Sequence, residues 1–135
     1  MKPWKQIDRG PIPGADAEMV LVRRGDEWVI RVGREVLMGT RMHGSERALA
    51  DLAYDRLGER PGARVLVGGL GVGFTAAAAL QRCPTGGEVV VAELVPKVVE
   101  WNRGPLGDAA GRPLDDPRVA IHVGDVAELV RSAGA

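Results

Sequence analysis

Alternating apolar and polar residues characterise the first third of the chain. Residues 18–24 and 27–33 both alternate in this way, and a glycine-containing turn separates them, which predicts a β-hairpin. A third short strand follows at residues 35–38. We therefore predict a small β-hairpin or meander over residues 18–42. The preceding residues 1–17 contain several prolines and glycines, and we expect them to form an irregular arm.

A helical period of hydrophobic residues replaces this alternation over residues 45–57, so we predict a helix there. Beyond it, apolar runs at residues 64–67, 88–93 and 118–123 alternate with helical segments. Strand–helix repetition of this kind is typical of a parallel sheet with right-handed crossovers. We predict an α/β fold in which residues 43–135 hold the linking helix and a partial Rossmann-like sheet, with its first three strands and their helices.

Composition narrows the class of protein further. The 135 residues carry 18 basic and 18 acidic side chains, and this balance argues against a nucleic-acid or membrane-surface binder. One cysteine, Cys83, and two histidines make a metal site improbable, so we assign no metal ligand. The sequence shows neither a signal peptide nor an apolar run long enough to span a membrane, and we expect a cytoplasmic protein.

A glycine-rich segment lies directly between the first apolar run of the α/β part and the helix after it. Residues 68–75 read GGLGVGFT, with Gly69, Gly71 and Gly73 at alternate positions. Glycines let a ligand approach the main chain, and the free N–H groups at a helix start attract an anionic or carboxylate-bearing ligand. The pattern also fits a tight turn without any ligand. Its position after a buried strand favours nucleotide-type binding.

Acidic residues follow the next two predicted strands. Glu93 ends the run at residues 88–93, where nucleotide-binding α/β folds place an acid that accepts hydrogen bonds from the ribose hydroxyls. The bland alternative is a solvated carboxylate at a strand end. Asp125 has two interpretations of equal weight. It accepts a hydrogen bond from an exocyclic amine such as that of adenine, or it caps the helix that follows.

Three segments in order form a combined motif that is more specific than any of its parts. They are residues 65–75 (VLVGGLGVGFT), 90–100 (VVAELVPKVVE) and 114–125 (LDDPRVAIHVGD). The combination resembles spermidine synthases and, more broadly, class I S-adenosylmethionine-dependent methyltransferases. The resemblance covers roughly residues 61–130.

The resemblance implies an adenosyl-binding site made of six residues: Gly69, Gly71, Gly73, Glu93, Asp125 and Val126. The glycines would face the amino-acid or thioether end of the ligand, and Glu93 would hold the ribose. Asp125 would bind the adenine amine, with Val126 near the ring. The implied ligand is S-adenosylmethionine or its decarboxylated form, and the implied function is that of a transferase acting on a small-molecule acceptor.

The chain also departs from the spermidine synthase pattern. Val72 stands where that family has an acidic residue, so a carboxylate that would pair with a cationic amine is missing. The family's catalytic aspartate follows a fourth strand that this chain does not supply, and we assign no catalytic base. We expect a truncated chain or one completed by a partner chain. A homo-oligomer would form through the β-hairpin or the bare, apolar edge of the sheet.

Two other functions fit parts of the sequence. Gly71, Gly73 and Ala76 match the G-x-G-x-x-A pattern of a nicotinamide-dinucleotide domain, and Glu93 follows at the required spacing of about 20 residues. The segment at residues 114–125 argues against this function, because such domains do not need it. The third function is a non-catalytic domain that keeps the fold and associates through the hairpin or the sheet edge.

Overall fold

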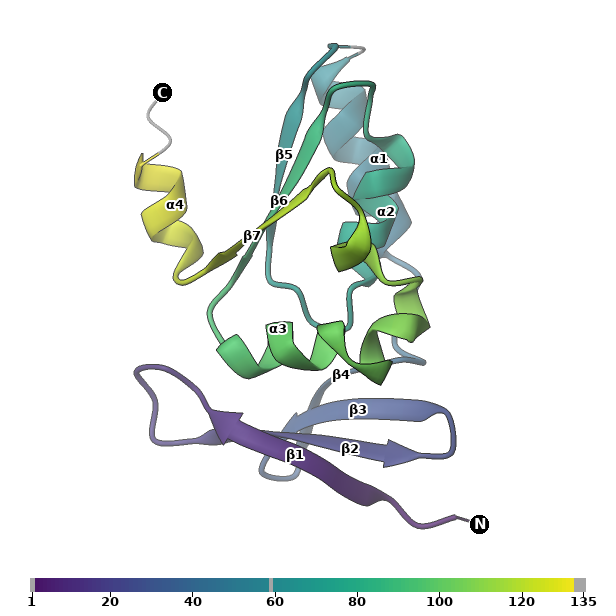
Figure 1. Ribbon diagram of the computed structural model, residues 1–135, viewed down its shortest axis with the longest axis vertical. Helices are drawn as coiled ribbons and strands as arrows, with labels where there is room; N and C mark the ends of the chain where they lie inside the picture. The colour runs from purple at the N-terminus through teal and green to yellow at the C-terminus, as the bar shows by residue number, and fades with distance from the viewer. Residues whose placement is uncertain (1, 59, 133–135) are drawn as a thin grey trace. The chain divides into compact units, whose positions relative to one another are not determined.

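The structure is a computed structural model that describes residues 2–58 and 60–132. It divides into two units, Met1–His43 and Gly44–Ala135. The first contains an antiparallel sheet, and the second contains a parallel sheet with its helices (Figure 1). This confirms the predicted fold class.

The first unit is a four-stranded meander. Its strands are β1 (Lys5–Pro11), β2 (Glu18–Arg24), β3 (Glu27–Val32) and β4 (Glu35–Gly39). Each strand pairs antiparallel with the one before it, in the order β1-β2-β3-β4. The two central strands supply the buried side chains, with Ile30 fully buried. Burial along these strands does not alternate as the sequence pattern does, because the consecutive residues Leu21 and Val22 are buried, and so are residues 28–30.

The first strand corrects our expectation of an irregular arm over residues 1–17. Residues 5–11 form β1, which pairs with β2 from Lys5 opposite Arg23 to Pro11 opposite Glu18. The proline that suggested irregularity is the last residue of an edge strand, where a missing N–H interrupts no ladder. A shift of register between Gln6 and Asp8 marks the one irregularity of this pairing.

The second unit has a three-stranded sheet in the order β5-β6-β7, with both pairs parallel. Its helices and strands follow one another along the chain, and two short 3-10 helices, η1 and η2, precede the last strand. They are α1 (Glu46–Leu57), β5 (Arg64–Gly68), α2 (Phe74–Arg82), β6 (Glu88–Glu93), α3 (Pro96–Arg103), η1 (Pro105–Ala110), η2 (Pro113–Asp115), β7 (Val119–Val123) and α4 (Val126–Ser132).

Apolar packing holds this unit together around the central strand. Val89 and Val91 of β6 are fully buried, as expected for a strand with neighbours on both edges. The helices α1 and α2 lie side by side (Figure 1), and Arg82 of α2 bonds Asp51 and Asp55 of α1 at 2.7 and 2.9 Å. Pro96 begins α3, where its fixed φ and missing N–H are tolerated.

The carboxyl ends of the three parallel strands lie at the same end of the sheet (Figure 1). Gly68 is opposite Ala92, and Ala92 is opposite His122. Ligands of open α/β sheets bind outside the carboxyl ends of the strands. The fold therefore brings the glycine-rich loop, Glu93 and Asp125 together at the carboxyl-end edge of the sheet, where we expect such a ligand to bind.

No helix in the described part of the chain is long and apolar enough to cross a membrane.

Candidate functional site

The glycine-rich loop between β5 and α2 has a conformation that requires glycine. Gly69, Gly71 and Gly73 have backbone φ values of +101°, +55° and +92°, and residues with a side chain rarely adopt this region. The N–H of Gly69 donates to the carbonyl of Ala92 at 2.7 Å, and the N–H of Gly73 donates to the carbonyl of Leu70 at 2.9 Å. The loop is thus an ordered turn that leads directly into α2.

The two ends of this loop differ in the space around them. A Cβ added at Gly73 would lie 3.2 Å from both Asn102 Oδ1 and Pro113 Cγ. A Cβ added at Gly69 would meet nothing within 4 Å. The loop is therefore packed against the protein at Gly73 and open at Gly69, where a ligand can approach the main chain.

Glu93 connects the end of β6 to this loop. Its side chain is buried, with 7% of the residue exposed. Oε1 accepts a hydrogen bond from the N–H of Leu70 at 2.8 Å, and Oε2 accepts one from the N–H of Val95 at 3.0 Å. A carboxylate has about four acceptor positions, so each oxygen keeps one for a further donor. Glu93 therefore fixes the loop and retains the capacity to bind hydroxyl groups.

Asp125 and Val126 lie at the same edge of the sheet, after β7. The N–H of the preceding Gly124 donates to the carbonyl of Glu93 at 2.9 Å. Asp125 Oδ1 accepts a hydrogen bond from the N–H of Ala127 at 2.8 Å, so the capping interaction that we considered is present. Val126 Cγ2 lies 3.6 Å from where a Cβ on Gly68 would be, over the end of β5. The structure thus brings all six predicted residues to one edge, and their roles toward a ligand stay predictions.

Asn102 of α3 contacts the same loop, and sequence reasoning missed it. The residue is 2% exposed. Its Nδ2 donates to the carbonyl of Gly71 at 2.7 Å and to the carbonyl of Val98 at 2.8 Å. A signal was available in the sequence, because Asn102 follows Val98 and Val99 at helical spacing. An amide in the apolar stripe of a helix needs a buried partner.

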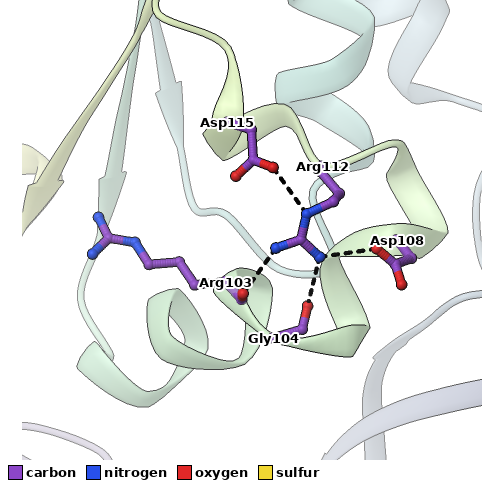
Figure 2. A network of polar contacts seen from close by, with 5 residues as sticks. All are labelled: Arg103, Gly104, Asp108, Arg112 and Asp115. Carbon is purple, nitrogen blue, oxygen red and sulfur yellow. Dashed lines mark hydrogen bonds and ion pairs between the residues drawn. The ribbon is translucent and has the colours of Figure 1, made fainter.

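A second polar network holds the segment between α3 and β7 (Figure 2). Arg112, which has a φ of +58°, donates from Nε to Asp115 and from NH1 to Asp108, both at 2.9 Å. The same guanidinium donates to the carbonyl of Gly104 at 3.1 Å and to that of Arg103 at 2.8 Å. One side chain therefore connects the end of α3 with both 3-10 helices.

This segment lies behind the glycine-rich loop. Pro113 and Ala110 both lie close to the position that a Cβ on Gly73 would take. Just beyond it, the Arg118 guanidinium bonds the Asp116 carboxylate at 2.8 and 3.0 Å, and the Arg118 N–H bonds it at 2.9 Å. These bonds lower the pKa of Asp116 to about 2. This segment, which includes the LDDPRV part of the combined motif at residues 114–119, thus supports the loop structurally.

The fold that these elements define is that of spermidine synthases. A spermidine synthase in complex with the transition-state analogue AdoDATO superposes with a TM-score of 0.70 over 94% of this chain and 43% of that chain, at 20% identity. The spermidine synthase of Thermotoga maritima gives a TM-score of 0.64 over 94% of this chain and 44% of that chain, at 19% identity. At these identities the likeness concerns the fold.

Sequence similarity points to the same group of enzymes. Polyamine aminopropyltransferases of Mycobacterium tuberculosis and Mycobacterium bovis are 36% identical to the chain over 117 residues, which is 86% of this chain. The chain spans about a fifth of the length of these curated relatives (21%). None of the protein-family models matches it. The resemblance to spermidine synthases that the combined motif indicated is confirmed, in fold and in sequence.

Proposed function

We propose that this chain forms the adenosyl-ligand site of an aminopropyltransferase-like enzyme. The observation that carries the proposal is the hydrogen bond that the N–H of Leu70, in the glycine-rich loop, donates to the carboxylate of Glu93 at the end of β6. It joins the glycine-rich loop to the acidic residue at the end of the next strand, and a nucleotide site of this kind needs both. The similarity to polyamine aminopropyltransferases supports transfer chemistry, and it favours decarboxylated S-adenosylmethionine over S-adenosylmethionine as the ligand.

The residues at the sheet edge fit such a ligand. The open side of the loop at Gly69 gives access to the main chain, and the N-terminus of α2 lies just beyond it. Glu93 keeps one acceptor position on each oxygen for the two ribose hydroxyls. Asp125 has a second carboxylate oxygen besides the one that bonds Ala127, and this oxygen suits the adenine amine.

Bound in this way, the ligand would supply an electrophilic carbon next to its sulfonium. The residues of this chain would then act by position: they hold the ligand so that a small-molecule amine can attack in line. No residue among those described is assigned as a catalytic base. We infer that Glu93 orients the ribose and that the loop sets the direction of the thioether end.

Isothermal titration calorimetry of the purified chain tests the proposal. The titrants are decarboxylated S-adenosylmethionine, S-adenosylmethionine, methylthioadenosine and NAD. We expect the adenosyl thioethers to bind and NAD not to bind. Binding of NAD alone would instead support the dinucleotide-binding function, and failure of all four ligands to bind would favour a non-catalytic domain.

A comparison of two ligands tests the role of Glu93 separately. Since Glu93 also holds the loop, Glu93→Ala alone cannot report on the ribose. The 2′,3′-dideoxy form of methylthioadenosine lacks both hydroxyls, and we expect Glu93→Ala to weaken its binding much less than that of methylthioadenosine itself. Equal losses for the two ligands would remove the ribose contact. Glu88→Ala, at the other end of β6, is the matched carboxylate control.

A further inference from the structure

The glycine-rich loop is fixed from two sides by buried polar side chains. Glu93, from the end of β6, accepts the N–H of Leu70. Asn102, from α3, donates to the carbonyl of the next residue, Gly71. Two elements that are distant in sequence from the loop thus hold its main chain, one at an N–H group and the other at a carbonyl group. Only Glu93 was singled out by its position in the sequence.

The orientation of the Asn102 amide follows from its neighbours. The carbonyl oxygens of Gly71 and Val98 only accept hydrogen bonds, so the nitrogen must face both of them. Both hydrogens of Nδ2 are then used. The oxygen Oδ1 points toward Gly73, whose N–H already donates to Leu70.

Within the part of the chain that the structure describes, Oδ1 itself has no hydrogen-bond partner, although Asn102 is almost completely buried. Burying an acceptor without a partner is unfavourable, and an apolar side chain of similar size would avoid this cost. The stability of the helix packing therefore does not explain an asparagine at this position. The bond to the Gly71 carbonyl does explain it, because no apolar residue could make that bond.

We propose that Asn102 is a positioning residue of the adenosyl-ligand site, which keeps the peptide unit after Gly71 in one orientation. Glycine at position 71 leaves this peptide unit free to rotate. The C=O and N–H of a trans peptide point in opposite directions, so holding the carbonyl toward Asn102 turns the N–H of Val72 away from it. The loop is then already in its binding conformation before the ligand arrives. This inference rests on the proposed adenosyl-ligand site.

Two substitutions that remove the Nδ2 donor test the role of Asn102. Asn102→Leu keeps the space in the core filled, whereas Asn102→Ala leaves most of the side-chain volume empty. If one of the two fails to fold, the other still provides the test. Val89→Ala is the control, because Val89 is fully buried near the start of β6, where it lies opposite Val65 and Val119 in the neighbouring strands.

The first measurement is hydrogen exchange of single amides by NMR, without ligand. The reporters are the hydrogen-bonded N–H groups of Gly69, Leu70 and Gly73. We expect their exchange to become about tenfold faster in both Asn102 variants, relative to amides of β6, and not in Val89→Ala. Unchanged exchange in the loop would overturn the inference, and so would an equal increase in the control.

The second measurement is the affinity for methylthioadenosine. We expect Kd to rise about tenfold in both Asn102 variants and to stay unchanged in Val89→Ala. Faster loop exchange with an unchanged Kd would show that the ligand does not need the ordered loop, and would overturn the inference. If the unchanged chain binds no adenosyl thioether while the loop exchange responds as expected, the proposed function fails and the loop-ordering role of Asn102 stands.

Discussion

Glu93 and Leu70 are joined by a hydrogen bond of 2.8 Å between a buried carboxylate and a backbone N–H. One residue ends a strand and the other lies in the loop that follows the neighbouring strand. The bond therefore fixes the loop to the sheet at the point where we expect the ligand to bind. The same carboxylate also accepts the N–H of Val95, so it determines how the chain leaves β6 as well.

Replacing Glu93 by glutamine should destabilise the second unit. The carboxylate accepts hydrogen bonds from two backbone N–H groups, those of Leu70 and Val95. The amide of glutamine has one acceptor oxygen, so it could accept from one of these N–H groups and would turn its NH₂ toward the other N–H. We expect Glu93→Gln to lower the free energy of unfolding by about 2 kcal/mol in urea titrations. Glu88→Gln, at the half-buried start of the same strand, should change it little, because among the described residues the Glu88 carboxylate forms an ion pair only with the exposed Arg64 side chain, at 3.4 Å. A Glu93→Gln variant as stable as the original chain would contradict the geometry.

Alanine at Gly73 should be more destabilising than alanine at Gly69. Both positions have φ near +100°, which costs a residue with a side chain about 1–2 kcal/mol. Only at Gly73 would the added Cβ also press on Asn102 and Pro113. We expect a loss of about 1 kcal/mol for Gly69→Ala and about 3 kcal/mol for Gly73→Ala, measured by equilibrium unfolding in urea. Equal losses would mean that the space behind Gly73 is not filled.

The Asp116–Arg118 pair should make stability depend on pH in the acid range. The guanidinium of Arg118 lowers the pKa of Asp116 from its ordinary value of 3.8 to about 2. A lowered pKa in the folded state stabilises the protein above pH 3.8, and this contribution is lost as the pH falls from about 4 to about 2. We expect the difference in melting temperature between the original chain and Asp116→Asn to shrink over that interval. A difference that stays constant down to pH 2 would exclude this ion pair as its source.

Tyr54 should titrate well above the usual range. Burial raises its pKa from 10.0 to about 12, and it is the single tyrosine of the chain. The absorbance of tyrosinate should therefore appear near pH 12 in the folded protein. A raised pKa in the folded state stabilises the protein below pH 10, and this contribution is lost as the pH rises from 10 to 12.

The variant Tyr54→Phe separates this titration from general alkaline unfolding. The hydroxyl of Tyr54 is buried near the Cys83 thiol, which also contributes to the raised pKa, and meets no other polar partner among the described residues. Its removal should therefore change stability little at neutral pH. The loss of stability between pH 10 and 12 should be smaller in Tyr54→Phe than in the original chain. Tyrosinate absorbance that appears near pH 10 while the chain is still folded would contradict the burial of Tyr54.

Hydrophobic patterning predicted most of the secondary structure, although it did not always identify the buried side. In α1, Leu49 and Leu52 of the hydrophobic period are exposed, and Tyr54 is buried instead. The strand at residues 88–93 and the helix at residues 45–57 agree closely with β6 and α1. Strand β1 was missed, because Pro11 at its end and the prolines on either side of it suggested a loop. The turns η1 and η2 were missed as well. Arg112 and its partners hold them, and contacts of this kind leave no hydrophobic period in the sequence.

The candidate site was predicted in part for a similar reason. Gly69 and Glu93 were found because they stand at the ends of predicted strands, where parallel topology places ligands. Asn102 comes from the interior of α3, and its relation to Gly71 exists only after the helix has packed against the loop. Asp125 differs from Asn102, because its partner is local. The sequence alone suggested that Asp125 caps the helix after it, and the structure contains this hydrogen bond from the N–H of Ala127.

The pairing order of the strands also sets the order in which the two sheets can form. In the meander each strand pairs with its immediate predecessor, as Arg24 does with Glu27 across one turn. In the parallel sheet Arg64 pairs with Glu88, and the glycine-rich loop and α2 lie between these two strands in the sequence. Local contacts form faster than distant ones, and an N-terminal unit folds first during synthesis. During synthesis, the antiparallel sheet can thus form while the residues of the proposed adenosyl-ligand site are still being translated.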